Sequence, residues 1–351
     1  FFRELSKYCK LKVRNFTIGD SWSGMSEFPH DAEPYINDTD KSILYEQNLW
    51  TQEGDRKNFK MYQSDEKNFI HDFNIVLNET NHYFFYDNYD GPKIGYCVWE
   101  TTKLPQDFFE KLKSYDEVWT PSKWQKQCLI EQGMDESFVK VVPEGVDANV
   151  FYPDKNTTNS LTSDGRFKFL LVGRWDYRKS TKEIIETFLK TFNPSEPVDL
   201  IINVDNPWGE SMDGCKTTEE RLALHNITDP RIKIVHFPSR EEYVSLLQTA
   251  NVFVSCARAE GWNLPLIESM ACGTPSIYSN CSAQLEFAKD KGIPVNVIGT
   301  KPAKENSYAR FSVSDMPGNY YEPNFEELSE KMRFSYEFYE EIKNTSIKES
   351  E

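Results

Sequence analysis

Two carboxylates, Glu260 and Glu268, lie on either side of an expected helix start in the segment AEGWNLPLIESMACG. The loop that carries Glu260 follows the apolar run NVFVSC, which is typical of a buried strand. Pro265 has the fixed φ and the missing N–H that suit a first helical position, and Gly273 gives the helix its stop. Because the unpaired N–H groups of such a helix point toward the loop, the segment suits an anionic ligand that also carries hydroxyl groups.

A second motif, GRWDYRKS, follows the apolar run FKFLLV. Gly173 lets the backbone turn sharply after the expected strand. Arg174 and Lys179 then flank the start of the next expected helix, where phosphate binds favourably and where an arginine can fork two phosphate oxygens. Both could also be ordinary surface cations, but their place directly after a buried strand in an acidic protein favours a phosphate site.

Together the two motifs resemble the retaining GT-B glycosyltransferases of family 4, also described as glycosyl transferases group 1. The donor domain of that family carries a G-R-x-x-x-x-K element and a pair of glutamates with seven residues between them, and the resemblance extends over roughly Lys168 to Tyr321. It implies an α/β fold of the GT-B type, with two Rossmann-like domains whose parallel sheets face a central cleft. It also implies transfer of a hexose from a nucleotide-sugar to an acceptor hydroxyl, with retention of anomeric configuration.

The resemblance implies a role for each matching residue. Arg174 and Lys179 would hold the diphosphate and offset charge on the departing nucleotide, and Glu260 would contact hydroxyls of the donor sugar. Glu268 would accept hydrogen bonds from the ribose. The further residues expected at the donor are Gly173, Asn263, Leu264 and, in the loop after RIKIV that would form a wall for the base, Phe237.

The sequence departs from the family pattern at two positions. Asn263 and Ser180 stand where the family often has glycine, and both are small or polar enough to preserve a turn, asparagine being tolerant of left-handed geometry. In the family no metal or other cofactor is needed, because cations and a helix terminus stabilise the leaving diphosphate. The sequence agrees with this expectation, since no Asp-x-Asp loop in a strand context and no double-displacement nucleophile is evident. The resemblance alone implies front-face attack, with the leaving phosphate oxygen taking the acceptor's proton.

The first half of the chain should bind a saccharide or glycosylated acceptor. His82 and Glu100 both follow expected strands, where a family member often places a polar residue against the donor sugar. Each could also be structural. The neighbouring aromatic cluster, from Tyr83 to Tyr89, could stack on a sugar ring or could simply pack.

Length and charge narrow the classes of function. A chain of 351 residues exceeds the usual size of one hydrophobic core, and 56 Asp and Glu against 40 Lys and Arg give a net charge of −16. An acidic surface repels nucleic acid and anionic membrane, so neither is an expected partner, although a lipid-linked acceptor stays open. Seven cysteines without a CxxC pair, and no apparent signal peptide or membrane-spanning run, favour a cytoplasmic protein.

Strand-like and helix-like segments alternate along both halves, which predicts parallel sheets covered on both faces. We expect an acceptor domain over 1–150, a donor domain over 151–325 and a terminal helix over 326–351 that packs back on the first domain. The polar tract Val146 to Arg166 would connect the domains. The opening residues read as the end of a helix followed by a strand, so we expect the first domain to lack its first strand here.

Three other functions stay open on the sequence alone. A nucleotide-sugar epimerase or a phosphorylase could use the same fold, but the first needs acid and base groups at the sugar and the second normally needs a cofactor lysine. Neither is visible. A non-catalytic module that binds nucleotide-sugars is the third.

Overall fold

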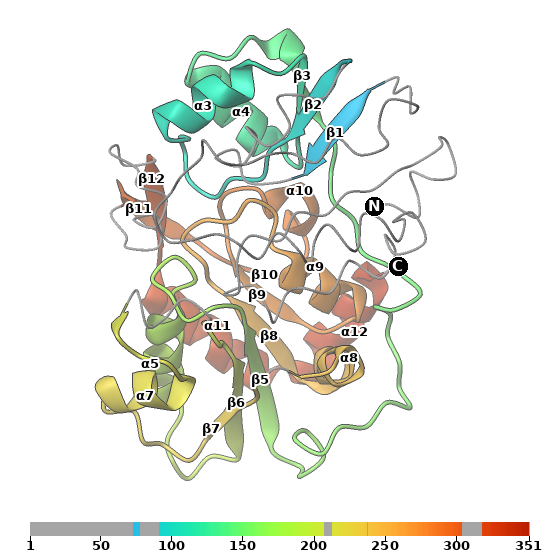
Figure 1. Ribbon diagram of the computed structural model, residues 1–351. Helices are drawn as coiled ribbons and strands as arrows, with labels where there is room; N and C mark the ends of the chain where they lie inside the picture. Colours follow the sequence, from blue (N-terminus) through green and yellow to red (C-terminus); the bar gives the residue numbers. More distant parts are fainter. Residues whose placement is uncertain (1–72, 78–90, 207–212, 237, 304–317, 351) are drawn as a thin grey trace, which may run out of the picture. The chain divides into compact units, whose positions relative to one another are not determined.

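The computed structural model describes residues 73–77, 91–206, 213–236, 238–303 and 318–350. All of them lie within 73–351, which forms one compact unit. In the described part of the chain the strands form three sheets, two of them parallel (Figure 1). The α/β class and the parallel sheets expected from the alternating pattern are therefore confirmed.

The first parallel sheet has the order β1-β2-β3-β4. Its strands are β1 (Asn74–Leu77), β2 (Lys93–Tyr96), β3 (Glu117–Thr120) and β4 (Val139–Val141). Two amphipathic helices, α3 (Gln106–Lys113) and α4 (Lys123–Glu131), connect β2 to β3 and β3 to β4, and a short 3-10 turn, Glu136–Phe138, precedes β4. Ser122 caps α4 by accepting a hydrogen bond from the Gln125 amide, as the sequence SKWQ predicts.

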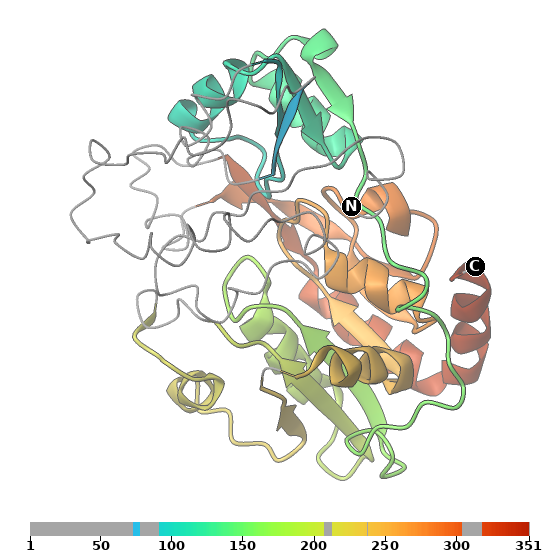
Figure 2. The same ribbon diagram turned by 45° about the vertical axis from the view of Figure 1, so that its right-hand side comes forward.

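The second parallel sheet has the order β10-β9-β8-β5-β6-β7, and the two motifs follow two of its strands. Figure 2 shows the same ribbon turned by 45° from the view of Figure 1. Its strands are β5 (Phe167–Val172), β6 (Val198–Asn203), β7 (Ile232–Ile234), β8 (Val252–Ser255), β9 (Ser276–Ser279) and β10 (Ile293–Val295). The helices between them are α5 (Thr181–Thr191), α7 (Thr218–Leu224), α8 (Arg240–Thr249), α9 (Leu264–Ala271) and α10 (Leu285–Ala288). The expected connection, Val146 to Arg166, contains no helix or strand.

Both faces of the second sheet are buried. Successive side chains of a strand point to opposite faces, so neighbouring residues join different cores. Phe169 and Leu171 of β5 join a core with α5, whereas Leu170 between them joins a second core with α8 and α9. This arrangement fixes the carboxyl ends of β5 and β8 side by side, since these strands pair in parallel. The loops that leave those ends are the two motifs.

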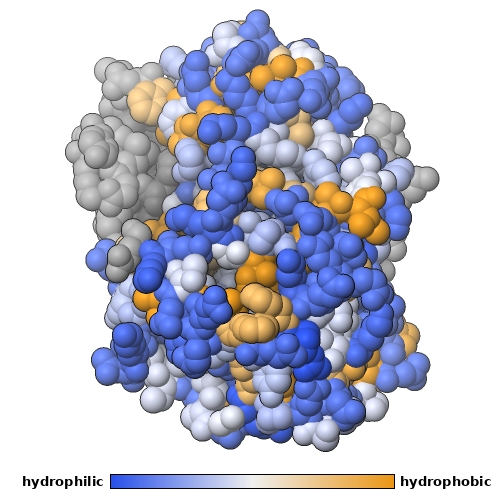
Figure 3. All heavy atoms as spheres, turned by 180° about the vertical axis from the view of Figure 1, so that it is seen from behind, coloured by the Kyte–Doolittle hydropathy of each residue, from blue (hydrophilic) through white to orange (hydrophobic). Residues whose placement is uncertain are grey.

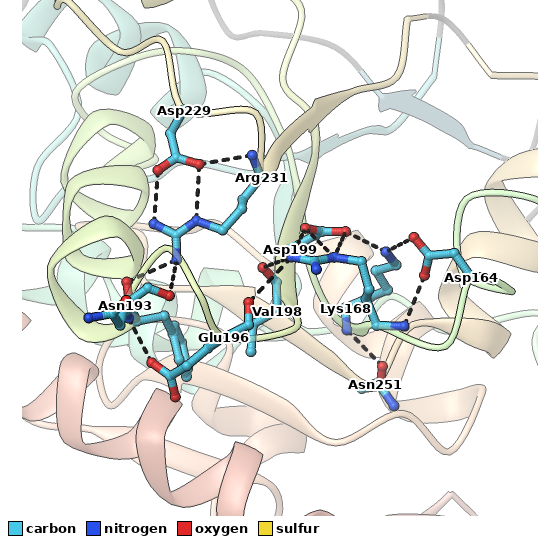
Figure 4. Close-up of polar contacts among 11 residues, drawn as sticks. Asp164, Lys168, Asn193, Glu196, Val198, Asp199, Asp229, Arg231 and Asn251 are labelled. Atoms are coloured by element: carbon cyan, nitrogen blue, oxygen red, sulfur yellow. Dashed lines mark hydrogen bonds and ion pairs between the residues drawn. The ribbon is translucent and has the colours of Figure 1, made fainter.

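A buried ionic network anchors the opposite, amino-terminal edge of this sheet (Figure 4). Lys168 and Asp199 are both almost fully buried, and the Lys168 Nζ lies 2.5 Å from Asp199 Oδ2. Arg166 donates to both oxygens of Asp199, and Lys168 also reaches Asp164 at 2.8 Å. Burial works to raise the pKa of Asp199, but hydrogen bonds from these two cations lower it on balance.

Two strands near the end of the chain form a hairpin that the sequence analysis does not predict. The segment that opens with NYYEP is a strand, β12 (Asn319–Pro323), which pairs antiparallel with β11 (Val297–Pro302). The sequence pattern predicts neither β10 and α10 nor this hairpin. Ala303 and Tyr320, from the hairpin, are buried in the core of the first sheet.

The terminal helices α11 (Phe325–Glu337) and α12 (Tyr339–Glu349) follow β12. Leu328 and Met332 of α11 lie in the core of the second sheet together with α5, so the predicted packing of 326–351 on the first domain is wrong for the described residues. The aromatic side chains of this segment do not form one buried face. Tyr336 and Tyr339 are partly buried against the core of the second sheet and contact Phe167, whereas Phe334 and Phe338 are exposed.

The surface is polar in the expected way. The face seen from behind is largely hydrophilic, with hydrophobic side chains gathered at a few places (Figure 3). Among the described residues no helix is long and apolar enough to cross a membrane.

Candidate active site

Gly173 ends β5 and opens the first motif. Its amide still pairs with the Asn203 carbonyl at 3.0 Å, while its φ of +154° turns the chain out of the sheet. A Cβ at this position would lie 3.6 Å from Lys179 Cδ, in ordinary contact. The Lys179 side chain therefore leaves room for a Cβ at position 173, and the unusual φ is the reason that glycine suits the position.

The turn between Gly173 and α5 is closed by its own polar groups. Asp176 Oδ1 accepts from the Lys179 amide at 2.7 Å, and the Thr181 hydroxyl donates to the Arg174 carbonyl at 2.8 Å. Ser180 precedes α5 with φ 55° and ψ 28°, which is the left-handed conformation. Serine thus occupies the conformation for which the family pattern often has glycine, as its small size predicted.

Glu260 lies between two cations at the carboxyl end of β8. Lys179 Nζ donates to Oε1 at 2.6 Å and Arg178 donates to Oε2 at 3.1 Å, so each carboxylate oxygen has one positive partner. The residue is only 4% exposed. Such a carboxylate is held in one orientation and can present its remaining lone pairs to a ligand.

The charges in this cluster oppose the effect of burial. Burial acts to raise the pKa of Glu260, but the neighbouring Lys179 and Arg178 charges outweigh it, and the pKa is lowered on balance. For Lys179 burial is the dominant effect and lowers the pKa, while the Glu260 charge partly restores it. Glu260 is therefore ionised at neutral pH, and the arrival of a further anion beside Lys179 would favour its charged form.

Arg178 is the functional candidate that sequence reasoning missed. It stands at an unspecified position of the G-R-x-x-x-x-K pattern, yet it is buried and donates to the Ala259 carbonyl at 2.9 Å as well as to Glu260. Its other terminal nitrogen lies 3.6 Å from Glu100 Oε1. A second cation next to the motif lysine was the available signal, but its burial depends on residues far away in sequence.

Glu100 was predicted on the acceptor side, and the structure brings it to this cluster. It follows β2 of the first sheet, is partly exposed and reaches Glu260 only through Arg178. His82, the other predicted residue of that side, and the aromatic cluster from Tyr83 to Tyr89 lie outside the described residues.

Arg174 lies on the same turn, but its side chain points to a different partner. Its guanidinium is 3.2 Å from Asp176 Oδ2 and is 28% exposed, so part of it is accessible to a ligand. The predicted pair of cations thus occupies one turn with distinct environments: Lys179 is tied to Glu260, whereas Arg174 is more open.

Glu268 lies on α9 and belongs to a separate contact. The Tyr243 hydroxyl of α8 donates to Glu268 Oε2 at 2.6 Å. Burial raises the pKa of this carboxyl, against the opposing effects of Tyr243 and Arg240. The two acids of the second motif are therefore not a coupled pair, because each has its own partners.

Asn263 and Leu264 form the start of α9. Asn263 has φ 80° and ψ 66°, which confirms the left-handed geometry for which asparagine was expected to substitute for glycine. Its side-chain amide donates to Ser255 Oγ at 3.0 Å and to Gln284 Oε1 at 2.7 Å. The Leu264 amide is at the helix start, where no intrahelical acceptor exists for it.

The loop after β7 was expected to form a wall for the base. Phe237 lies outside the described residues, but its neighbour His236 is described. The two ring nitrogens of His236 lie 2.8 Å from Asp205 Oδ1 and 2.7 Å from Glu219 Oε1. Hydrogen bonds that the His236 ring donates to Glu219 and to Asp205 raise the pKa of His236.

Gly261, next to Glu260, lies against the segment that follows β2. A Cβ on Gly261 would be 2.5 Å from Val98 Cγ1 and 3.2 Å from both the amide nitrogen and the carbonyl oxygen of Trp99. Only glycine fits there without movement of a neighbour. This contact and the Arg178–Glu100 pair bring residues of both parallel sheets to the loop that carries Glu260.

The fold class follows from these elements and from solved structures that share them. Anabaena HepE in complex with UDP and glucose superimposes with a TM-score of 0.60 and 14% identity, covering 80% of this chain and 73% of that one. The fold is therefore that of the GT-B glycosyltransferases, an α/β fold with parallel sheets.

The sequence of the second sheet matches a known family. Residues 154–305 match the family described as Glycosyl transferases group 1. Mannosylfructose-phosphate synthase of Agrobacterium fabrum is 27% identical over 198 residues, 51% of this chain and 42% of its own length. A probable sucrose-phosphate synthase of Thermosipho melanesiensis is 26% identical over 54% of this chain and 41% of its own. The chain thus spans about two fifths of these relatives.

Proposed function

We propose that this protein transfers a hexose from a nucleotide-sugar to a hydroxyl of a saccharide or glycosylated acceptor, with retention and without a metal ion. The observation that carries the proposal is Glu260 held between Arg178 and Lys179 beside the start of α9. A fixed carboxylate next to cations and unpaired helix amides can bind sugar hydroxyls and a diphosphate at the same time.

The cations would stabilise the departing nucleotide. The Arg174 side chain is 28% exposed, and Lys179 is oriented by its hydrogen bond to Glu260. When the bond between the anomeric carbon and the diphosphate breaks, negative charge grows on the phosphate oxygen. Positive groups already in place lower that barrier without having to reorganise.

The two glutamates would bind hydroxyls of different parts of the donor. Glu260 would accept hydrogen bonds from the transferred sugar, and Glu268 would accept them from the ribose. The Tyr243 hydroxyl already donates to Glu268, which supports this carboxylate as an acceptor for hydroxyl groups. The amides of Asn263 and Leu264 would add contacts to phosphate or sugar, and Phe237 would contact the base.

Attack would come from the face that the nucleotide leaves. The acceptor oxygen forms its bond to the anomeric carbon as the phosphate bond breaks, and the acceptor proton passes to the departing phosphate oxygen. Neither glutamate is then required as a nucleophile, which agrees with the commitment of both Glu260 oxygens to cations. Glu100 would adjoin the acceptor side through Arg178, and His82 is proposed there as well.

The first experiment is to incubate the protein with UDP-glucose, GDP-mannose and ADP-glucose and to measure release of free sugar. We expect slow hydrolysis of at least one donor, abolished in Arg174→Ala and in Glu260→Gln. Arg231→Lys, a change at the opposite edge of the sheet, is the matched control (Figure 4). Binding of a donor without hydrolysis, insensitive to both changes, would support the binding-module alternative and contradict the proposal.

Retention and metal independence need separate measurements. With the active donor and a panel of sugar acceptors, proton NMR of the first-formed product should show the anomeric configuration of the donor. Addition of EDTA should leave the rate unchanged. An inverted product would contradict front-face attack, and a rate restored only by a divalent ion would contradict the metal-independent mechanism.

A further inference from the structure

We infer that Arg258 is a positioning residue that holds the turn bearing Arg178 and Lys179 in the conformation that clamps Glu260. This inference rests on the proposed function. Arg258 lies two residues before Glu260 and is 3% exposed. Its interactions run to the turn before α5, to α5 itself and to the β11–β12 hairpin.

The guanidinium of Arg258 is bonded on every side. It donates to the Tyr177 carbonyl at 2.5 Å, to Ser180 Oγ at 3.1 Å and to Glu183 Oε1 at 2.9 Å. Its plane lies over the Tyr177 ring, with Cζ 3.6 Å from the ring centroid. One side chain thus binds Tyr177 in the turn, the left-handed Ser180 at its end and Glu183 in the first turn of α5.

The backbone of Arg258 adds a direct link to the cations. Its amide donates to the Arg178 carbonyl at 2.7 Å. Arg178 and Lys179 lie between Tyr177 and Ser180, the two residues that the guanidinium holds. Among the described residues, Arg258 has no hydrogen bond or ion pair with Glu260 or with a position assigned to the donor, so we infer that it acts on the site through the turn.

Ser180 explains why this turn needs external support. A non-glycine residue in the left-handed conformation is strained, because its Cβ approaches backbone atoms. The Arg258 hydrogen bonds to the Ser180 hydroxyl and the Tyr177 carbonyl exist only while the turn keeps this conformation. They stabilise it where the family pattern would use glycine.

Arg258 also connects the turn to the hairpin. Its Nε donates to Glu322 Oε1 at 3.2 Å, and its carbonyl accepts from the Tyr321 amide at 2.9 Å. Glu322 is in turn paired with Lys301 of β11 at 2.9 Å and accepts from the Tyr177 hydroxyl at 3.0 Å. The Arg258 side chain thus donates to four acceptors, on Tyr177, Ser180, Glu183 and Glu322. A lysine at position 258 keeps the charge but cannot donate to all four at once, because it lacks the planar fork of arginine.

The test compares Arg258→Lys with Arg231→Lys. Arg231 is a matched control, since it is 5% exposed, pairs with the Asp229 carboxylate and donates to the carbonyls of Phe192 and Asn193 at the opposite edge of the same sheet. The first readout is hydrogen–deuterium exchange of residues 174–184, measured by mass spectrometry without ligand. The second is kcat and KM for hydrolysis of the donor that the wild type uses among UDP-glucose, GDP-mannose and ADP-glucose.

We expect Arg258→Lys to raise exchange in 174–184 and to lower kcat/KM at least tenfold more than Arg231→Lys, mainly through kcat. Adding Ser180→Gly should recover several-fold of the loss, because glycine adopts the left-handed conformation without support. If Arg258→Lys does not fold, Glu322→Gln should show the same effects on a smaller scale.

Equal losses in the two lysine variants, or exchange in 174–184 that stays at the wild-type level, would overturn the inference. Failure of the proposed function has a different signature. In that case the wild type hydrolyses none of the donors, while the exchange measurement still decides whether Arg258 holds the turn.

Discussion

At the scale of single residues, the site depends on how a buried negative charge is matched. Glu260 has a cation on each oxygen, and the pKa of its carboxyl is lowered although burial alone would raise it. The stability that this group contributes is therefore present above the ordinary pKa of glutamate and is lost only as the pH falls through the lowered value. Glu260 therefore stays ionised at neutral pH.

The link between Glu260 and Lys179 can be tested chemically. In Glu260→Gln the Lys179 amine loses the charge that partly restores its pKa, so burial lowers the pKa further and more of the amine is neutral. We expect Lys179 to react faster with acetic anhydride at neutral pH in this variant than in the wild type, as measured by mass spectrometry of the labelled peptide.

Lys190 is the internal reference, because it is exposed on α5 and pairs with Glu326 rather than with Glu260. Its labelling should not change. Slower or unchanged labelling of Lys179, relative to Lys190, would contradict the proposed effect of Glu260 on this amine.

Residues of these motifs could be predicted because their chemistry is written in short segments. The structure brings Gly173, Lys179 and Glu260 together, and Asn263 and Ser180 adopt left-handed geometry. Arg178 could not be found in this way. Its role depends on contacts with Glu260 and Glu100, which lie about 80 residues away on either side, and a single sequence contains no record of such distances.

A buried charge pair elsewhere should govern stability. Asp199→Asn would leave the Lys168 ammonium fully buried beside a neutral amide, with Asp164 as its remaining charged partner, and we expect a loss of about 3 kcal/mol in the free energy of unfolding. Lys168→Met should cost less, because Asp199 would keep Arg166. Urea denaturation measures both.

The pair lies at the amino-terminal edge of the second sheet, away from the motifs (Figure 4). Donor hydrolysis below the unfolding transition should therefore stay near the wild-type rate in both variants. A larger loss of stability in Lys168→Met than in Asp199→Asn would contradict the assignment of Lys168 as the more dependent partner.

At the scale of elements, the helices begin and end where local chemistry dictates, and the loops between them decide the site. α7 and α8 both start with capping boxes, formed by Thr217 with Glu220 and by Ser239 with Glu242. Such signals can be seen in a sequence. β10, which has three residues, and β11, which is as long as β5 but largely exposed, could not, because no long apolar run and no clear alternation marks either strand.

His236 joins three elements and makes their contact sensitive to pH. It follows β7 and bridges Asp205, which follows β6, and Glu219 at the start of α7, while Thr218 also donates to Asp205. Because these carboxylates raise the pKa of His236, its contribution to stability is present below its ordinary pKa of about 6.5 and is lost as the pH rises through the raised value.

We expect the difference in melting temperature between the wild type and His236→Asn to be larger at pH 6 than at pH 9. Differential scanning calorimetry at both pH values measures it. A difference that grows with rising pH would mean that His236 is not charged when it bridges the two carboxylates.

At the scale of the whole described unit, the loop that carries Glu260 packs closely against Val98 and Trp99, which follow β2. Gly261→Ala would place a methyl group 2.5 Å from Val98 Cγ1, so we expect a loss of about 1–3 kcal/mol in the free energy of unfolding. Val98→Ala in the same protein should recover part of the loss, although contact with the Trp99 backbone would remain. Chemical denaturation of the two single variants and the double variant measures the coupling.

Gly299→Ala is the matched control for this cycle. It lies on β11 with nothing within 4 Å of its virtual Cβ, and the substitution should be nearly neutral. Additive effects of Gly261→Ala and Val98→Ala, with no recovery in the double variant, would contradict the predicted contact.

Tyr320 has a consequence for dissection of the chain. This side chain is fully buried and lies, with Ala259 and Ala303, in the core formed by Trp99, Phe108 and other residues around the first sheet. A recombinant fragment that stops at the predicted boundary near residue 150 would lack all three and would expose apolar surface that the intact chain covers. The first sheet should therefore be difficult to obtain as an independent folding unit, even though every one of its strands precedes the polar connection.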